Sequence, residues 1–319
     1  MKVLEIKDLS LGFDTEGGFY PALHNINFDL SQGEMHALVG ESGCGKSMTA
    51  MSILNLLPKN AKITSGEIIF NGKNILTLSN KEYQEIRGSK IALIPQDPMT
   101  SLNPLYTVGN QLLEVIEIHQ NLKGDEAKSV AIEALEQVKI PDAKNRMNAY
   151  PHEFSGGMKQ RAIIAMALAC KAEILIADEP TTALDVTIQA QIMNILKEIK
   201  KEYNASIILI THDLGLVYEN ADRVSVMYSG RIVEEARANE FFSNPRHPYS
   251  IALLNSMPSD KNSKLLTING QPPTIQQQIQ GCKFNPRCQN VMEVCKSKVP
   301  TLNLINANHS CACFLNCEN

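Results

Sequence analysis

The pattern of apolar and polar positions predicts strands and helices that alternate along roughly the first 240 residues. Some segments alternate strictly, as strands do, and others are short apolar runs between turns. The predicted strands lie at 3–11, 23–30, 35–39, 66–71, 90–94, 174–177 and 206–210, and helices are predicted at 48–57, 158–170 and 186–203. Strands that alternate with helices imply an α/β fold with a mainly parallel, covered sheet.

Two stretches depart from this alternation. Helical patterns dominate from Asp97 to about Pro151, which indicates an inserted helical region. After Glu240 the alternation fades, and residues 259–280 are polar and Gln-rich, as in a linker to a cysteine-rich tail. We therefore predict one domain over 1–240, with a helical subdomain at about 97–157, and a C-terminal region over 241–319.

Composition excludes several classes of protein. The chain has 319 residues, 44% of them hydrophobic, with a net charge of −4 and a pI of about 6.0. A nucleic-acid-binding surface usually brings a basic excess, which this chain lacks. No apolar run approaches the roughly 18 residues that span a bilayer, and charges at Lys2 and Glu5 interrupt any export signal. We expect a cytoplasmic protein whose membrane role depends on partners.

The cysteines gather near the C-terminus. Six of the eight lie between Cys282 and Cys317, and the other two are Cys44 and Cys170. In a reducing cytoplasm such a cluster favours metal binding over disulfides.

A phosphate-binding loop occupies the turn between the third predicted strand and the first helix. Gly40-Glu41-Ser42-Gly43-Cys44-Gly45-Lys46-Ser47 matches G-x-x-x-x-G-K-[ST] in the required strand–turn–helix context. Its glycines let backbone N–H groups approach phosphate oxygens, and the helix start favours an anion. Lys46 would hold the β- and γ-phosphates, and Ser47 would bind Mg²⁺. The alternative, a chance glycine-rich turn, does not account for this context.

Two carboxylates end the apolar strand that begins at Ile174. At the carboxyl edge of a covered sheet, Asp178 and Glu179 would face a ligand crevice. Asp178 suits the Mg²⁺ shell, and Glu179 suits activation of the attacking water. Adjacent acids can also simply be solvated at a strand end, but the phosphate loop favours the catalytic interpretation.

A second helix start has the character of an anion site. Ser155-Gly156-Gly157 opens the helix that continues through Met158 and Arg161, and its free N–H groups could face an anion. A plain Ser-Gly helix cap is the alternative. The distance of this motif from the phosphate loop gives no reason for it to serve the same nucleotide.

Taken together, these motifs resemble the ATPase subunits of ABC transporters. Ser155-Gly156-Gly157 is similar to the family's signature motif, and Gln96 to its Q-loop glutamine. Leu184-Asp185 resembles the D-loop, and His212 the switch histidine. With the phosphate loop and the Asp178-Glu179 pair, these elements follow the family order and cover about residues 1–240.

The resemblance implies a head-to-tail nucleotide sandwich and an ATPase activity. ATP bound on Gly40–Met48 of one chain would be closed over by Ser155, Gly156 and Gly157 of another. Glu179, His212 and Gln96 would be catalytic, Asp185 would contact nucleotide, and Ser47, Gln96 and Asp178 would bind Mg²⁺. Phe13 is placed to stack on adenine, with Phe19 and Tyr20 as rivals, and any of the three could be ordinary core.

The resemblance narrows to the dipeptide, oligopeptide and nickel importers. It is carried by the extended Q-loop at 96–104, by Tyr150-Pro151-His152, by Arg246-His247-Pro248-Tyr249 and by the tail from Gly281 to Cys295. Relatives with this tail carry an iron–sulfur cluster, which implies a [4Fe–4S] group on Cys282, Cys288, Cys295 and Cys313. Cys311 and Cys317 are rivals for the fourth position, and zinc or unligated thiols are the alternatives.

The same resemblance implies a set of partners. A second homologous ATPase chain, two transmembrane permeases and an extracytoplasmic binding protein are expected, at the cytoplasmic face of the membrane, with uptake of dipeptides or oligopeptides. Nickel or antimicrobial-peptide transport shares these motifs. A soluble ABC ATPase would usually carry a coiled-coil insertion or a second cassette, and a GTPase would need Asn-Lys-x-Asp, whereas Asn80-Lys81-Glu82-Tyr83 lacks the final Asp.

Overall fold

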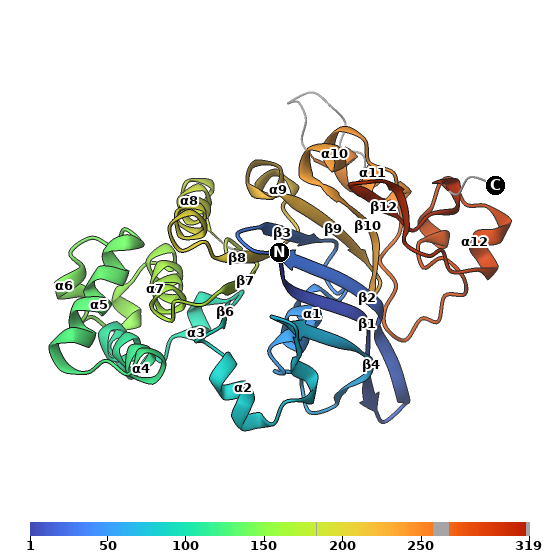
Figure 1. The fold of residues 1–319 in the computed structure, drawn as a ribbon. Coiled ribbons are helices and arrows are strands. Elements are labelled where there is room, and N and C mark those ends of the chain that lie inside the picture. Colours follow the sequence, from blue (N-terminus) through green and yellow to red (C-terminus); the bar gives the residue numbers. More distant parts are fainter. Residues whose placement is uncertain (183, 258–267, 317–319) are drawn as a thin grey trace. The chain divides into compact units, whose positions relative to one another are not determined.

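The computed structural model describes residues 1–182, 184–257 and 268–316 (Figure 1). These residues form two compact units. The first unit comprises Met1–Ser31, Met35–Thr77 and Thr211–Asn319, and the second comprises Gln32–Glu34 and Leu78–Ile210. We describe each unit by itself.

An antiparallel sheet in the first unit has the strand order β2-β1-β4-β5. Its strands are β1 (Lys2–Thr15), β2 (Gly18–Ser31), β4 (Ala61–Phe70) and β5 (Lys73–Asn74), followed by the short helix η1 (Ile75–Thr77). β1 pairs with both β2 and β4. Its apolar residues Leu4, Ile6, Leu9 and Leu11 are buried, in keeping with the predicted alternation.

The first unit also contains five strands in the order β11-β12-β10-β9-β3. β3 (Met35–Val39) is parallel to β9 (Arg223–Tyr228), whereas β10 (Arg231–Arg237) is antiparallel to both β9 and β12 (His309–Cys311), and β11 (Asn303–Asn306) pairs with β12. The helices of this unit are α1 (Lys46–Ile53), α9 (Leu214–Asn220), α10 (Ala238–Ser243), α11 (Pro248–Asn255), η3 (Asn285–Arg287), α12 (Glu293–Ser297) and η4 (Phe314–Asn316).

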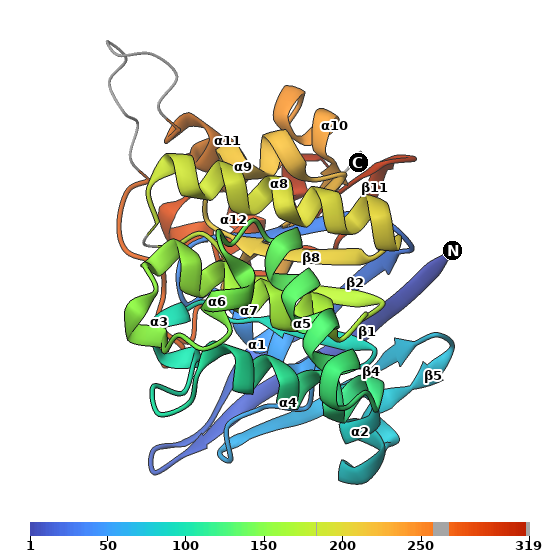
Figure 2. The ribbon, with the colours of Figure 1, turned by 90° about the vertical axis from the view of Figure 1, so that its left-hand side faces the viewer.

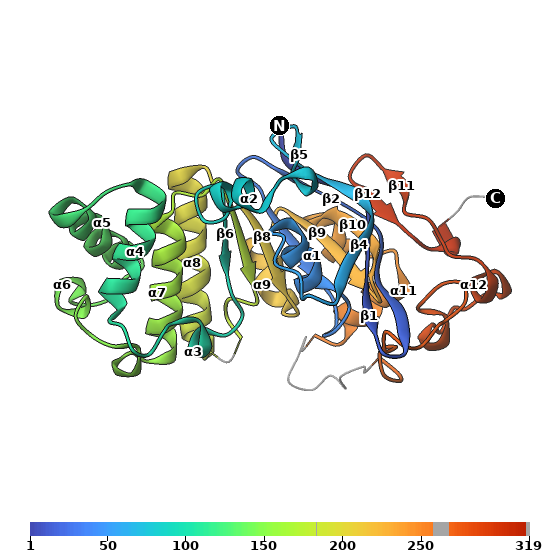
Figure 3. The same ribbon diagram turned by 90° about the horizontal axis from the view of Figure 1, so that it is seen from below.

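The second unit combines a three-stranded parallel arrangement with a group of helices. β6 (Ile91–Ile94), β7 (Ile174–Asp178) and β8 (Ser206–Thr211) pair in the order β8-β7-β6. Helices α4 and α5 pack on α7, and α7 also contacts α8 (Figures 2 and 3). The helices are α2 (Asn80–Ile86), α3 (Pro98–Ser101), α4 (Val108–Gln120), α5 (Gly124–Gln137), α6 (Ala143–Arg146), η2 (Pro151–Glu153), α7 (Gly156–Ala169) and α8 (Val186–Tyr203).

The α/β fold is confirmed, but the expectation of a mainly parallel sheet is wrong in part. β6, β7 and β8 are parallel, and so are β3 and β9, whereas β1, β2, β4, β10, β11 and β12 make antiparallel pairs. The physical reason is connectivity, since β1–β2 and β9–β10 are joined by short turns that permit only antiparallel neighbours.

The domain boundary expected near residue 240 stays a prediction, because the two compact units do not address it. The expected linker at 259–280 falls partly outside the described residues, and its described part, 268–280, contains no helix or strand. Among the described residues, no helix is both long and apolar enough to span a membrane.

A buried carboxylate joins β10 to the C-terminal residues of the first unit. Glu234 is fully buried and accepts hydrogen bonds from His309 Nε2 at 2.7 Å and from the backbone N–H groups of Arg246 and His247 at 2.7 and 2.8 Å. Burial pushes the pKa of Glu234 upward, but these hydrogen bonds outweigh it and hold the pKa below the ordinary 4.5. The ionised carboxylate therefore contributes to the stability of this region.

Glu234→Gln is expected to lower the free energy of unfolding by about 2 kcal/mol at pH 7, because an amide replaces a charged acceptor of several hydrogen bonds. Since the folded pKa is depressed, this contribution is present above 4.5 and is lost as the pH falls through the lowered folded value. Urea unfolding at pH 7 and near pH 4 measures both effects. Glu293→Gln is the matched control, because that side chain is 89% exposed. An equal loss in the two variants would contradict this account.

Candidate nucleotide-binding and catalytic site

The phosphate loop of the first unit lies between β3 and α1 and is closely packed. Gly40 has φ +153°, and a Cβ on it would lie 2.2 Å from the carbonyl oxygen of Met227, so a larger residue cannot replace it without a shift of the backbone. Lys46 is buried, and its Nζ donates to the carbonyl oxygens of Gly40 and Glu41 at 2.8 and 3.0 Å. The ammonium group is therefore held over the loop in which it is expected to meet phosphate.

Residues far along the chain support this loop. The N–H of Glu41 donates to Tyr249 Oη at 2.9 Å, and Arg287 makes two bonds to the Glu41 carboxylate at 2.7 and 3.0 Å. Arg287 Nη1 also donates to Tyr228 Oη at 3.3 Å. Sequence reasoning missed these roles, although Tyr249 and Arg287 lie inside two of the motifs that carried the family resemblance.

His212 shares a cavity with the phosphate loop. The cavity measures about 410 Å³ and is lined by Gly40, Glu41, His212 and the C-terminal residues Gly270, Gln271 and Pro272, among others. This places the predicted switch histidine beside the start of the phosphate loop. A group bound there would lie between the loop and the residues that precede α9.

A second cavity opens on the other part of the loop. It measures about 480 Å³ and is lined by Gly43, Gly45 and Met48 together with Phe13. Of the three aromatic candidates for adenine stacking, Phe13 is the one that lines this cavity. Phe19 is 42% exposed and packs against Gly12, and Tyr20 pairs with Phe13 across β1 and β2. The geometry favours Phe13.

The predicted catalytic carboxylate stands at the end of β7 in the second unit. Glu179 has φ +47°, a left-handed conformation that costs a non-glycine residue roughly 1–2 kcal/mol. Gln96 Nε2 and Thr182 Oγ1 both donate to Glu179 Oε2, at 2.9 and 2.8 Å. The adjacent Asp178 is buried. Gln96 and Glu179 are thus brought together as predicted, in an orientation fixed by two hydrogen bonds.

The signature segment and the D-loop lie near each other in the same unit. Ser155 is the N-cap of α7, and its Oγ accepts from Met158 N at 3.3 Å, whereas Asp185 caps α8 by accepting from Ile188 N at 3.0 Å. A Cβ on Gly157 would lie 2.8 Å from Ile188 Cγ2, so a glycine lets the two helices approach. Ala183, within the predicted D-loop, lies outside the described residues.

Four cysteines line one cavity in the first unit. It holds about 310 Å³ of atom-free space, lined by Cys282, Cys288, Cys295 and Cys313 with Phe284 and Phe314 beside them. Burial raises the pKa of the thiols of Cys282, Cys288 and Cys313. Cys311 lies on β12 instead, and its Sγ accepts from Asn316 Nδ2 at 3.5 Å. Cys317 lies outside the described residues.

The described residues contain no group of three or more His, Cys, Asp or Glu side chains arranged so that it could hold a metal ion. The predicted Mg²⁺ residues lie in both units, with Ser47 at the start of α1 and with Gln96 and Asp178 beside β6 and β7. The Mg²⁺ ligands and the iron–sulfur ligands therefore stay predictions.

Two family models match the chain. The model described as "ABC transporter" matches residues 23–182, and the model described as "Oligopeptide/dipeptide transporter, C-terminal region" matches residues 233–295. The two matches contain, respectively, the phosphate loop with Asp178 and Glu179, and three of the four cysteines of the cavity.

Individual relatives match over nearly the full length. The chain is 50% identical to a probable peptide ABC transporter ATP-binding protein, y4tR, of Sinorhizobium fredii, over 98% of this chain and 94% of the relative. It is 49% identical to the oligopeptide transport ATP-binding protein OppD of Escherichia coli, over 98% and 93%. It is 49% identical to the dipeptide transport ATP-binding protein DppD of Bacillus subtilis, over 98% and 95%.

Solved structures share the fold. The ATP-binding cassette MJ0796, in a dimeric post-hydrolysis state bound to ADP and Pi, superposes with a TM-score of 0.66 at 28% identity and covers 74% of this chain and 98% of its own. CbiO1 of Clostridium perfringens, part of a transporter complex, superposes with a TM-score of 0.66 at 31% identity and covers 76% and 91%.

Proposed function

This chain belongs to the family of ABC transporter ATP-binding proteins, and we propose that it hydrolyses ATP to energise the import of dipeptides or oligopeptides. The resemblance to the dipeptide-permease ATPase subunit usually called D agrees with this assignment. The observation that carries the proposed chemistry is the carboxylate of Glu179, which is held at the end of β7 by Gln96 and Thr182.

In the proposed reaction, ATP and water give ADP and phosphate. Lys46 neutralises the β- and γ-phosphates on the loop from Gly40 to Met48, and Ser47, Gln96 and Asp178 hold Mg²⁺. Glu179 orients and deprotonates the attacking water, and His212 contacts the γ-phosphate. Mg²⁺, when bound, neutralises developing charge on the phosphates.

The proposed site is completed by a second ATPase chain. Ser155, Gly156 and Gly157 begin α7 with backbone N–H groups directed away from the helix, which suits contact with the γ-phosphate of a nucleotide held on the partner's phosphate loop. Asp185, at the start of α8 near this segment, would contact the partner's nucleotide site. We propose a homologous chain as the partner, so that the pair is a heterodimer.

The proposed contact with the permeases involves the segment after Gln96. Met99, Leu105 and Tyr106 are 60%, 80% and 55% exposed, although all three are large and apolar. Apolar side chains grouped on a surface in this way are typical of a docking site. We propose that two transmembrane permeases dock there, that the chain lies at the cytoplasmic face of the membrane, and that a binding protein delivers the peptide.

The four cysteines of the 310 Å³ cavity fit a [4Fe–4S] cluster. In such a cluster each thiolate binds a different iron, so the ligand sulfurs surround a volume and do not converge on one ion. Cys282, Cys288, Cys295 and Cys313 surround one cavity, as this arrangement requires, and we propose them as the ligands. When bound, the cluster would join residues 282–295 to the chain's end. We assign it no role in the hydrolysis of ATP.

Reconstitution tests the proposed transport. The chain, its partner ATPase and the two permeases are placed in vesicles with the binding protein, and uptake is followed with a labelled dipeptide, a labelled pentapeptide and Ni²⁺. We expect ATP-dependent uptake of peptide and turnover that rises when peptide-loaded binding protein is present. Uptake of Ni²⁺ alone would favour the nickel branch, and hydrolysis that does not respond to any permease would favour a soluble ATPase.

A further inference from the structure

A C-terminal segment lies beside the phosphate loop. Residues 273–280 contribute most of one side of the 480 Å³ cavity that also contains Phe13, and Gln271 and Pro272 line the cavity of His212. All of these residues belong to the first unit. The segment therefore touches the space on both sides of the loop that is expected to hold the phosphates.

The lining of the larger cavity suits a purine. Phe13, Pro21, Ala22 and Met48 supply apolar surface from the cassette, and Ile275 and Ile279 supply it from the C-terminal segment. None of the residues that line it is Asp or Glu, so an anionic ligand meets no like charge. About 480 Å³ lies within the usual range for small-molecule sites.

The segment is held in place from one short stretch of chain. Arg287 Nε donates to the carbonyl oxygen of Asn269 at 3.0 Å, Lys283 Nζ to that of Ile279 at 2.9 Å, and Asn285 Nδ2 to that of Gln280 at 2.8 Å. These three anchors lie between Cys282 and Cys288. Because Arg287 also binds the Glu41 carboxylate, the same stretch fixes both the segment and the phosphate loop.

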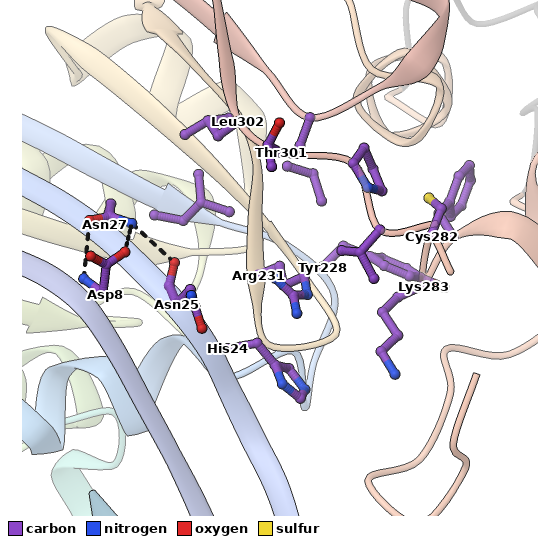
Figure 4. Close-up of a pocket in the computed structure, with 16 residues that line it drawn as sticks. Asp8, His24, Asn25, Asn27, Tyr228, Arg231, Cys282, Lys283, Thr301 and Leu302 are labelled. Carbon is purple, nitrogen blue, oxygen red and sulfur yellow. Dashed lines mark hydrogen bonds between the residues drawn. The ribbon is translucent and has the colours of Figure 1, made fainter. Parts of the chain in front are cut away.

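His24 and Lys283 bound the cavity at one end. They also line a neighbouring cavity of about 430 Å³, where Figure 4 shows them grouped with Arg231. Burial, with the charges of Arg231 and Lys283, lowers the pKa of His24 to about 4, so His24 is neutral at pH 7. The end of the purine-sized cavity is therefore cationic through Lys283 and is not made more so by His24.

We propose that residues 273–280 form the outer wall of the nucleotide-base pocket, opposite Phe13, so that the C-terminal region takes part in binding the adenine nucleotide. This inference rests on the proposed nucleotide function. Its physical basis is the burial of the purine face between an aromatic ring and the side chains of Ile275 and Ile279.

The test compares a ligand that has a base with one that does not. Binding of Mg-ADP and of Mg-pyrophosphate to the full-length chain is measured by titration calorimetry for wild type and for the double variant Ile275→Ala, Ile279→Ala. We expect ADP affinity to fall about tenfold in the double variant, with pyrophosphate affinity unchanged. Asn285→Ala, which releases Gln280, is expected to weaken ADP in the same selective way.

Leu304→Ala is the matched control, since Leu304 is a C-terminal apolar residue that is 71% exposed on β11, and it should bind both ligands as wild type does. Circular dichroism and the melting temperature show whether each variant is folded. Unchanged ADP affinity in both wall variants would overturn the inference, and so would equal losses for ADP and pyrophosphate, which would mean that the segment only supports the phosphate loop. A wild-type chain that binds neither ligand would overturn the proposed function itself.

Discussion

Glu179→Gln is expected to lower ATP turnover by a factor of roughly 100 to 10,000 while ATP binding remains, because the amide cannot accept a proton from the attacking water. The variant keeps the shape of the side chain and one oxygen that can accept from Gln96 and Thr182. The phosphate loop, which belongs to the first unit, is unaltered. Phosphate release and equilibrium ATP binding are measured on the chain assembled with its permeases.

Glu173→Gln is the matched control for this prediction. Glu173 precedes β7 and pairs with Lys90 at 2.8 Å, with both side chains substantially exposed, so its replacement is expected to change little. Turnover of the Glu179→Gln form within a few-fold of wild type would remove Glu179 from the proposed role. Loss of ATP binding in that form would instead indicate that the residue has a structural function.

Cys313→Ser is expected to abolish most of the iron, the acid-labile sulfide and the brown absorbance of the purified protein, whereas Cys311→Ser is expected to keep them. The reason is position, because Cys313 lines the cavity with the other three cysteines and Cys311 lies on β12 next to Asn316. A serine hydroxyl is a poor substitute for a thiolate in an iron–sulfur site. Iron and sulfide analysis after anaerobic purification measures both variants.

The two serine variants test the ligand assignment from opposite sides. Retention of the cluster in Cys313→Ser together with its loss in Cys311→Ser would reverse the assignment. Stoichiometric zinc without sulfide in the wild-type protein would replace the cluster by a zinc site. Cys170→Ser, a buried cysteine in the second unit, serves as a control for general loss of a thiol.

Local motifs made much of the candidate site predictable. The phosphate loop, Asp178 with Glu179 and the start at Ser155 each depend on a few consecutive residues, so their spacing alone indicated them. The first helix was expected from Met48, yet it begins at Lys46. Its first turn carries the polar residues Lys46 and Ser47, which give no apolar periodicity to mark a helix start.

Strands β9 and β10 had no clear signal in the sequence, because charged residues interrupt them. Glu234 is nevertheless buried, and Arg223 is paired with Asp29 and Glu235. Burial of charge that is paired across strands cannot be read from periodicity, since a charged residue normally indicates exposure.

Long-range support for the phosphate loop was equally hidden. Tyr249 and Arg287 reach Glu41 from 208 and 246 residues away along the chain. Both lie in motifs that had been noticed only as family markers. Their contacts follow from the way the first unit folds, and a single sequence contains no signal that pairs such distant positions.

The central claim is that two chains jointly enclose each nucleotide. A structure of the Glu179→Gln form, trapped with Mg-ATP in its complete assembly, tests it most directly. The account predicts Ser155 Oγ within about 3 Å of the γ-phosphate of a nucleotide held by another chain's phosphate loop. A nucleotide enclosed by one chain alone, with Ser155 far from any triphosphate, would contradict it.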